Sequence, residues 1–111
     1  MKSIKIIVLS VMTVFALSVL AKSTKVKSTF FVNGVCDQCK ERIETAALNA
    51  GANKAYWSET TKDLSVVYDK DKIDLQKIQK AIALVGHDNA KYKAPEKVYN
   101  NLHHCCQYER Q

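Results

Sequence analysis

Hydrophobic residues along the first half of the chain follow two periods. Residues 29–33 (TFFVN) are aromatic and β-branched, and they predict a strand that ends before Gly34. From Asp37 to about Ala50 the apolar residues recur at helical spacing, and Gly51 follows them, as is typical of a helix end. This predicts a helix with one apolar face. That face holds Cys39, Ile43, Ala46, Ala47 and Ala50.

The second half of the chain repeats strand and helix patterns. Residues 54–60 and 64–68 predict two strands, and the polar turn at residues 61–63 between them favours an antiparallel hairpin. Residues 74–85 carry an apolar stripe at i, i+3, i+7 and i+10, which predicts a second helix packed on a core. Residues 88–93 are the candidate for a fourth strand.

The element order β-α-β-β-α-β predicts an α+β fold. In the ferredoxin-like form of this order, two helices cover one face of a four-stranded antiparallel sheet. We therefore expect one domain over residues 29–93. The expected core consists of Phe30, Val32, Ile43, Ala47, Trp57, Leu64, Val66, Leu75, Ile78, Ile82 and Val85.

Residues 94–111 form a tail beyond this domain. Pro95 suits the first turn of a short helix, on which Val98, Tyr99 and Leu102 share a face. A sheet with helices on one side leaves its other face open, and Phe31, Tyr56 and Val67 are expected to point there. We expect the tail to pack across part of that face or beside it.

The first 21 residues have the pattern of a secretory signal peptide. Lys2 and Lys5 precede an uncharged apolar run from Ile6 to Leu20, and cleavage after Ala21 fits the small residues there. The alternative is an uncleaved membrane anchor, for which the run is short. Cleavage predicts a periplasmic or secreted protein without stable membrane insertion. Residues 22–28 (KSTKVKS) are polar and are expected to form a loose leader.

Length and charge narrow the possible functions. With 111 residues the chain has room for about one domain, which excludes a large two-domain enzyme. Loss of residues 1–21 would lower the net charge from +6 to +4, which favours a partner with an acidic docking surface. No dense Lys/Arg stripe indicates nucleic-acid binding. No Ser-His-Asp grouping, phosphate loop or carboxylate pair indicates an enzyme.

The chemistry-bearing motif is Cys36-Asp37-Gln38-Cys39, at the junction of the first strand and first helix. Two thiols at this spacing can direct both sulfurs to one point. Free N–H groups at a helix start favour the thiolate, which is the form that binds metals and reacts with disulfides. Two thiolates suit Cu(I) or Zn(II). Alone, the motif is also compatible with a redox dithiol or a disulfide.

From Lys27 to Lys93 the chain resembles the heavy-metal-associated domain family, which includes copper chaperones, N-terminal domains of metal ATPases and periplasmic mercury-binding proteins. Members carry G-M-x-C-x-x-C on the first loop, whereas this chain has Gly34-Val35 directly before Cys36. The Met is thus replaced by Val35 or Gly34, and the loop is one residue shorter. The resemblance implies the ferredoxin-like fold, and Cys36 and Cys39 as metal ligands.

Five further residues are candidate metal ligands. His87 follows the second predicted helix, and in this fold its loop lies beside the first loop, where a His is able to ligate or to respond to protons. The alternative is a surface His bonded to backbone. The tail contributes a His-His-Cys-Cys run, which could instead be a reactive chain end. Its cysteines could also pair with those of the first loop. This run is His103, His104, Cys105 and Cys106.

Three functions fit these residues. The favoured one is an exported protein that captures a soft ion, above all Cu(I), on Cys36 and Cys39 and passes it by ligand exchange to a metal-transport or efflux protein. The second is a Zn(II) or Hg(II) binding or storage protein that adds tail ligands, since four N/S ligands suit tetrahedral Zn(II). The third is a thiol–disulfide oxidoreductase. The Cys-x-x-Cys motif fits this function, but the predicted order of strands and helices is not that of the thioredoxin family.

Overall fold

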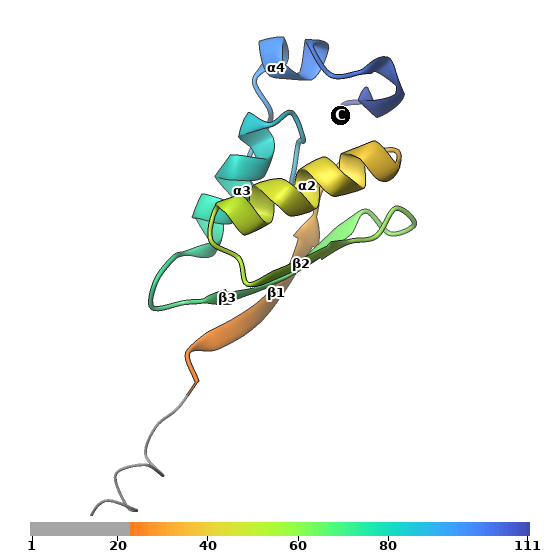
Figure 1. Cartoon of the computed structure of the whole chain (residues 1–111). Helices are drawn as coiled ribbons and strands as arrows, with labels where there is room; N and C mark the ends of the chain where they lie inside the picture. Colours follow the sequence, from red (N-terminus) through yellow and green to blue (C-terminus); the bar gives the residue numbers. More distant parts are fainter. Residues whose placement is uncertain (1–22) are drawn as a thin grey trace, which may run out of the picture.

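The computed structural model describes residues 23–111 (Figure 1). The predicted signal peptide at residues 1–21 lies outside this range. Within residues 23–111, no helix is long and apolar enough to cross a membrane. The elements are β1 (Lys25–Phe31), α2 (Asp37–Asn49), β2 (Lys54–Trp57), β3 (Asp63–Asp69), α3 (Leu75–Leu84), α4 (Glu96–Asn100) and the 3₁₀ turn η1 (His104–Cys106).

Within the described residues, the sheet has three antiparallel strands in the order β1-β3-β2. In the centre, Leu64 of β3 pairs with Phe30 of β1 on one side and with Trp57 of β2 on the other. Helices α2 and α3 lie together on one face of this sheet (Figure 1). The α+β class and the two-helix layer are as predicted.

The expected fourth strand at residues 88–93 is wrong. It is reduced to a single bridge between Val32 and Asn89. The side chain of Asn89 accepts hydrogen bonds from the backbone N–H groups of Lys91 at 3.1 Å and Tyr92 at 3.2 Å, and the backbone N–H of Asn89 donates to the Tyr92 carbonyl. These local bonds turn the chain away from the sheet, which is how Asn side chains compete with strand pairing.

The leader prediction for residues 22–28 is wrong from Lys25 onwards, because β1 begins there. Val26 faces the core side and is half-buried, while Lys25 is exposed and pairs with Asp69. Thr24 donates a hydrogen bond of 2.6 Å to the Asp69 carboxylate. Exposed lysines are typical of edge strands. The polar residues of this segment therefore belong to a strand, although their composition suggested a loose leader.

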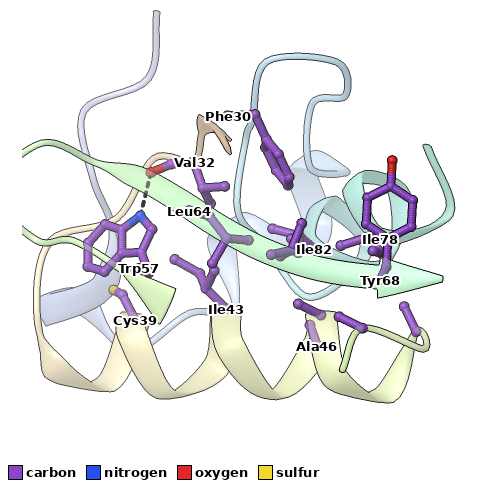
Figure 2. Close-up of a cluster of buried hydrophobic side chains, with 14 of the residues drawn as sticks. Phe30, Val32, Cys39, Ile43, Ala46, Trp57, Leu64, Tyr68, Ile78 and Ile82 are labelled. Carbon is purple, nitrogen blue, oxygen red and sulfur yellow. Dashed lines mark hydrogen bonds between the residues drawn. The ribbon is translucent and has the colours of Figure 1, made fainter. Parts of the chain in front are cut away.

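The core lies between the sheet and the two helices (Figure 2). Trp57, Leu64, Ile43 and Ile82 have no exposed surface. Every predicted core residue contributes, although Leu75 and Val85 at the ends of α3 are only partly buried. The side chain of Asp74 caps α3 by accepting from the backbone N–H of Lys77 at 2.9 Å. Gly51 and Gly86 follow α2 and α3 with φ of +117° and +112°, which glycine adopts readily.

The tail does not cover the open face of the sheet. Phe31 and Tyr56 on that face are 39% and 63% exposed. The tail lies instead at the end of the molecule where α2 begins (Figure 1). The buried Tyr108 holds it there, because its hydroxyl accepts from the Asp88 N–H at 2.8 Å and donates to the Gly86 carbonyl at 2.7 Å.

Candidate metal centre

The loop before α2 is held by Trp57. The indole N–H donates to the Val32 carbonyl at 2.9 Å. A Cβ on Gly34 would lie 3.0 Å from the Trp57 ring and 3.2 Å from the Cβ of Cys39, so a side chain at position 34 would crowd both residues. Lys62 donates a hydrogen bond to the Gly34 carbonyl. The bulky indole thus fills the space beside Gly34 and fixes the path of the loop.

This loop brings Cys36 and Cys39 together at the start of α2. Cys36 is the N-cap residue and is half-buried, whereas Cys39 lies in the first turn and has no exposed surface. Figure 2 shows the Cys39 sulfur beside Trp57. The two Sγ atoms are 3.8 Å apart. Both sulfurs are therefore available to one ion, as the motif spacing predicts.

The two thiols differ in acidity. The backbone N–H of Cys39 at the helix start is the largest influence on Cys36 and lowers the pKa of its thiol to about 7. Burial raises the pKa of the Cys39 thiol to about 11. At neutral pH Cys36 is thus the thiol with substantial thiolate character, and Cys39 keeps its proton until a ligand replaces it.

The tail adds a third sulfur. Cys106, in η1, has no exposed surface, and its Sγ lies 3.6 Å from that of Cys36. The sulfurs of Cys36, Cys39 and Cys106 all lie within 4.8 Å of one another. All four cysteines of the chain are free thiols, including Cys105. The tail therefore contacts the predicted site through Cys106, and no disulfide links the two.

The other tail candidates lie outside this three-sulfur cluster. Cys105 is exposed, with its Sγ 4.0 Å from that of Cys106 and 3.7 Å from Nδ1 of His103. His103 and His104 are exposed, and their ring centroids lie 5.7 Å apart. Their ligation stays a prediction.

His87 is buried among protein groups rather than directed at the sulfurs. It has no exposed surface, its Nδ1 lies 2.8 Å from the Asn33 carbonyl, and its Nε2 lies 3.3 Å from the Arg42 guanidinium. Burial lowers the pKa of His87 to about 4. The neutral ring thus donates to Asn33 and accepts from Arg42. Both nitrogens have partners, and the ring stacks on Tyr108 at 5.7 Å.

Sequence reasoning missed the residues that hold the tail in place. Arg110 donates two hydrogen bonds to the Asp88 carboxylate, at 3.0 and 2.8 Å, and one to the Ala94 carbonyl at 2.8 Å. Tyr99 donates from its hydroxyl to the Tyr108 carbonyl. The one available signal was the spacing of an aromatic and a cationic residue two and four positions after Cys106.

The family model of the heavy-metal-associated domain matches residues 29–88, just over half of the chain. Solved structures agree. The CopZ metallochaperone is 28% identical with a TM-score of 0.56, and the match covers 59% of this chain and 100% of that one. Oxidized MerP from Ralstonia metallidurans CH34 is 26% identical with a TM-score of 0.56, covering 60% of this chain and 94% of that one.

A copper-binding domain from HMA7, a P-type ATPase, is 26% identical with a TM-score of 0.54, and the match covers 57% of this chain and 88% of that one. The search of curated protein sequences finds no match. Three observations indicate the same family: the sequence match, the shared fold and the cluster of three cysteine sulfurs. The chain belongs to the heavy-metal-associated domain family and carries the cysteine cluster of a heavy-metal-binding protein.

Proposed function

We propose that this protein captures Cu(I) on Cys36 and Cys39 and passes it to a metal-transport or efflux protein by ligand exchange. The observation that carries the proposal is the 3.8 Å separation of these two sulfurs at the start of α2, in the loop where the family has its cysteine pair. Thiolates are the soft ligands that Cu(I) prefers. The similarity to the CopZ metallochaperone and to a copper-binding domain of a P-type ATPase supports copper.

The site suggests an order of events in capture and transfer. Cys36 is the more accessible and the more acidic thiol, so the incoming ion meets it first. Cys39 then loses its proton and becomes the second ligand, since metal binding to thiols releases protons. Transfer reverses this order, with a ligand of the partner entering on the Cys36 side. The exchange needs no catalytic acid or base, which supports a non-enzymatic role.

The proposal includes export and an acidic partner. The signal-peptide pattern of residues 1–21 supports a periplasmic or secreted location. The positive net charge supports attraction to an acidic surface. Two cations of α2 have partners within the protein. Lys40 bonds Glu44 at 2.6 Å and the Trp57 carbonyl at 2.9 Å, and Arg42 faces His87. Of the two, only Lys40 is paired with a carboxylate, and Arg42 keeps its charge beside the neutral His87, so steering would come from Arg42 and the distributed lysines.

The test compares copper retention in the wild-type protein and the Cys36→Ser/Cys39→Ser variant, both purified in the form that exporting cells produce. Native mass spectrometry under reducing conditions, with a competing chelator, should find one Cu(I) on the wild type. The double variant should bind at least about 100-fold more weakly, equivalent to about 2.8 kcal/mol. The measured mass also reports cleavage after Ala21.

The matched control is Cys105→Ser, which removes an exposed thiol outside the three-sulfur cluster and should leave copper retention unchanged. Equal retention by the wild type and the Cys36→Ser/Cys39→Ser variant would contradict the proposal. Retention of Zn(II) or Hg(II) in preference to Cu(I) would keep the site and change the cargo. Hg(II) has support from the similarity to MerP.

A further inference from the structure

We propose that Cys106 is a third ligand of the cargo ion, so that the tail converts the two-cysteine loop into a closed three-thiolate site. This inference rests on the proposed function, since it assumes that Cys36 and Cys39 bind the ion. It assigns the coordination: a soft ion, Cu(I) in the first instance, in a trigonal arrangement of sulfurs. Trigonal thiolate binding differs from a two-coordinate carrier site in geometry and in the ease of release.

The distances between the sulfurs favour three ligands over two. For a metal–sulfur bond of about 2.3 Å, two sulfurs on opposite sides of an ion lie about 4.6 Å apart, and three sulfurs around it in a plane lie about 4.0 Å apart. The Cys36 sulfur lies 3.8 Å from that of Cys39 and 3.6 Å from that of Cys106. Both separations are shorter than a linear pair requires and close to the trigonal value, and the Cys39 and Cys106 sulfurs lie within 4.8 Å of each other, so all three sulfurs can reach one ion.

The tail is anchored by contacts that do not involve sulfur. Tyr108 is buried, and its hydroxyl bridges the Asp88 N–H and the Gly86 carbonyl. Arg110 binds the Asp88 carboxylate through two nitrogens. Because these anchors lie two and four residues after Cys106, they place its thiol before any ion arrives. A ligand that is already in position loses less conformational entropy on binding, which strengthens binding.

The third thiol is an addition to the family domain. The family model matches residues 29–88, which include Cys36 and Cys39, and Cys106 lies 18 residues beyond the match. The segment that carries it returns to the start of α2 and buries Cys106 against the two loop cysteines. The closure is therefore a feature of this chain's tail and not of the two-cysteine loop.

A packing role is the competing explanation for Cys106, since a buried free cysteine often acts as a small apolar side chain. Its surroundings favour ligation. Its sulfur faces the Cys36 sulfur and lies 3.8 Å from the Gln38 side-chain oxygen, and its own carbonyl is 4.0 Å from the Cys39 sulfur. The ion would thus be enclosed, and transfer would require the tail to release one thiolate before a partner's ligand enters.

X-ray absorption of the Cu(I)-loaded protein, in the form that exporting cells produce, tests the coordination directly. We expect three sulfurs around copper in the wild type and two in Cys106→Ala. Cys105→Ala is the matched control, because it removes the neighbouring thiol, and it should keep three. Competition with a chelator should show Cu(I) binding at least tenfold weaker in Cys106→Ala and unchanged in Cys105→Ala.

Two sulfurs around copper in the wild type would overturn the inference, as would four sulfurs in the wild type or three in Cys106→Ala. The wild-type measurement decides even where Cys106→Ala folds poorly. The proposed function fails by a different result, namely copper retention by the Cys36→Ser/Cys39→Ser variant. A wild type with two loop sulfurs and firmly bound copper would refute the third ligand and leave the carrier role intact.

Discussion

The loop at the start of α2 and the C-terminal tail bring thiols to the same point by different means. Cys36 and Cys39 are placed by local structure, because one is the N-cap of α2 and the other lies in its first turn. Cys106 is placed by contacts with residues about 20 positions away in the chain, above all Asp88. Local placement survives changes elsewhere, whereas the tail depends on a few specific bonds. The two halves of the cluster can therefore be separated by mutation.

His87 lies between the two regions and contacts both. Its ring bonds the Asn33 carbonyl in the loop and stacks on Tyr108 in the tail. It has no exposed surface, and burial lowers its pKa from 6.5 to about 4. Protonation of this ring would place a charge in an enclosed space beside the Arg42 guanidinium. Protonation of His87 at low pH should therefore weaken the contacts of both the loop and the tail.

The largest expected effect is a loss of stability in acid through His87. Between pH 6.5 and 4 the His87 ring binds a proton in the unfolded chain but not in the folded one. The free energy of unfolding is therefore unaffected by protonation of His87 above pH 6.5 and decreases as the pH falls towards 4. The loss amounts to about 3 kcal/mol for a shift of this size. Urea unfolding of the metal-free, reduced protein at several pH values measures it.

His87→Gln should unfold with a much smaller pH dependence over that interval, whatever its stability at pH 7. The matched control is His104→Gln, which changes an exposed histidine of the tail and should keep the wild-type slope. A His87→Gln variant with the same acid slope as the wild type would show that another group governs the transition, and would remove His87 as the link between loop and tail.

The fold could be predicted where the apolar residues of a helix or strand lie on one face, because that face is the one that packs against the core. The apolar stripes of α2 and α3 specify which side packs, and the polar turn around Lys62 specifies the hairpin. The fourth strand could not, because the side-chain bonds of Asn89 outweigh the pattern of its neighbours. The start of β1 was missed because Lys25 is polar at an exposed edge.

The site, like the fold, could be predicted only where local sequence decides the structure. Cys36 and Cys39 follow from motif and helix start, both local signals. The choice of Cys106 over Cys105 depends on the direction of the 3₁₀ turn and on the Tyr108 anchor, which sequence spacing does not reveal. His87 could not be judged from sequence, because its role depends on tertiary contacts.

A smaller effect is expected when the ion pair of the tail is removed. Asp88→Ala deletes the acceptor of two Arg110 hydrogen bonds and of the Ala94 N–H bond at 2.7 Å. Bonds to charged groups contribute more than neutral ones, and we expect a loss of about 2 kcal/mol in the free energy of unfolding. Cys106 should also react faster with an alkylating reagent, measured by peptide mass spectrometry, while Cys39 changes less.

Asp71→Ala is the control for this variant, since Asp71 is an exposed carboxylate outside the tail contacts. It should leave both stability and Cys106 reactivity near wild type. Equal acceleration of Cys39 and Cys106 in Asp88→Ala would mean that loop and tail open as one unit, which would contradict the separation of the two regions.

The smallest effect is expected from Tyr108→Phe, which removes one hydroxyl and keeps the ring. The ring still stacks on His87 and meets Tyr99 edge to face at 5.0 Å, so the tail should stay in place. The lost bonds to Asp88 and Gly86 should lower the free energy of unfolding by about 1 kcal/mol. The same loss should increase the rate of Cys106 alkylation about fivefold, if the tail opens independently of the core.

Tyr56→Phe removes a hydroxyl from the open face of the sheet, where Tyr56 is 63% exposed, and provides the matched control with no expected change. Copper bound to Tyr108→Phe should still have three sulfur ligands but should pass to a chelator faster than from the wild type, because the tail opens more often. If transfer speeds up in neither variant, opening of the tail does not limit release. Ligand exchange at Cys36 and Cys39 would then limit release, and the Cys106–copper bond would break without undocking of the tail.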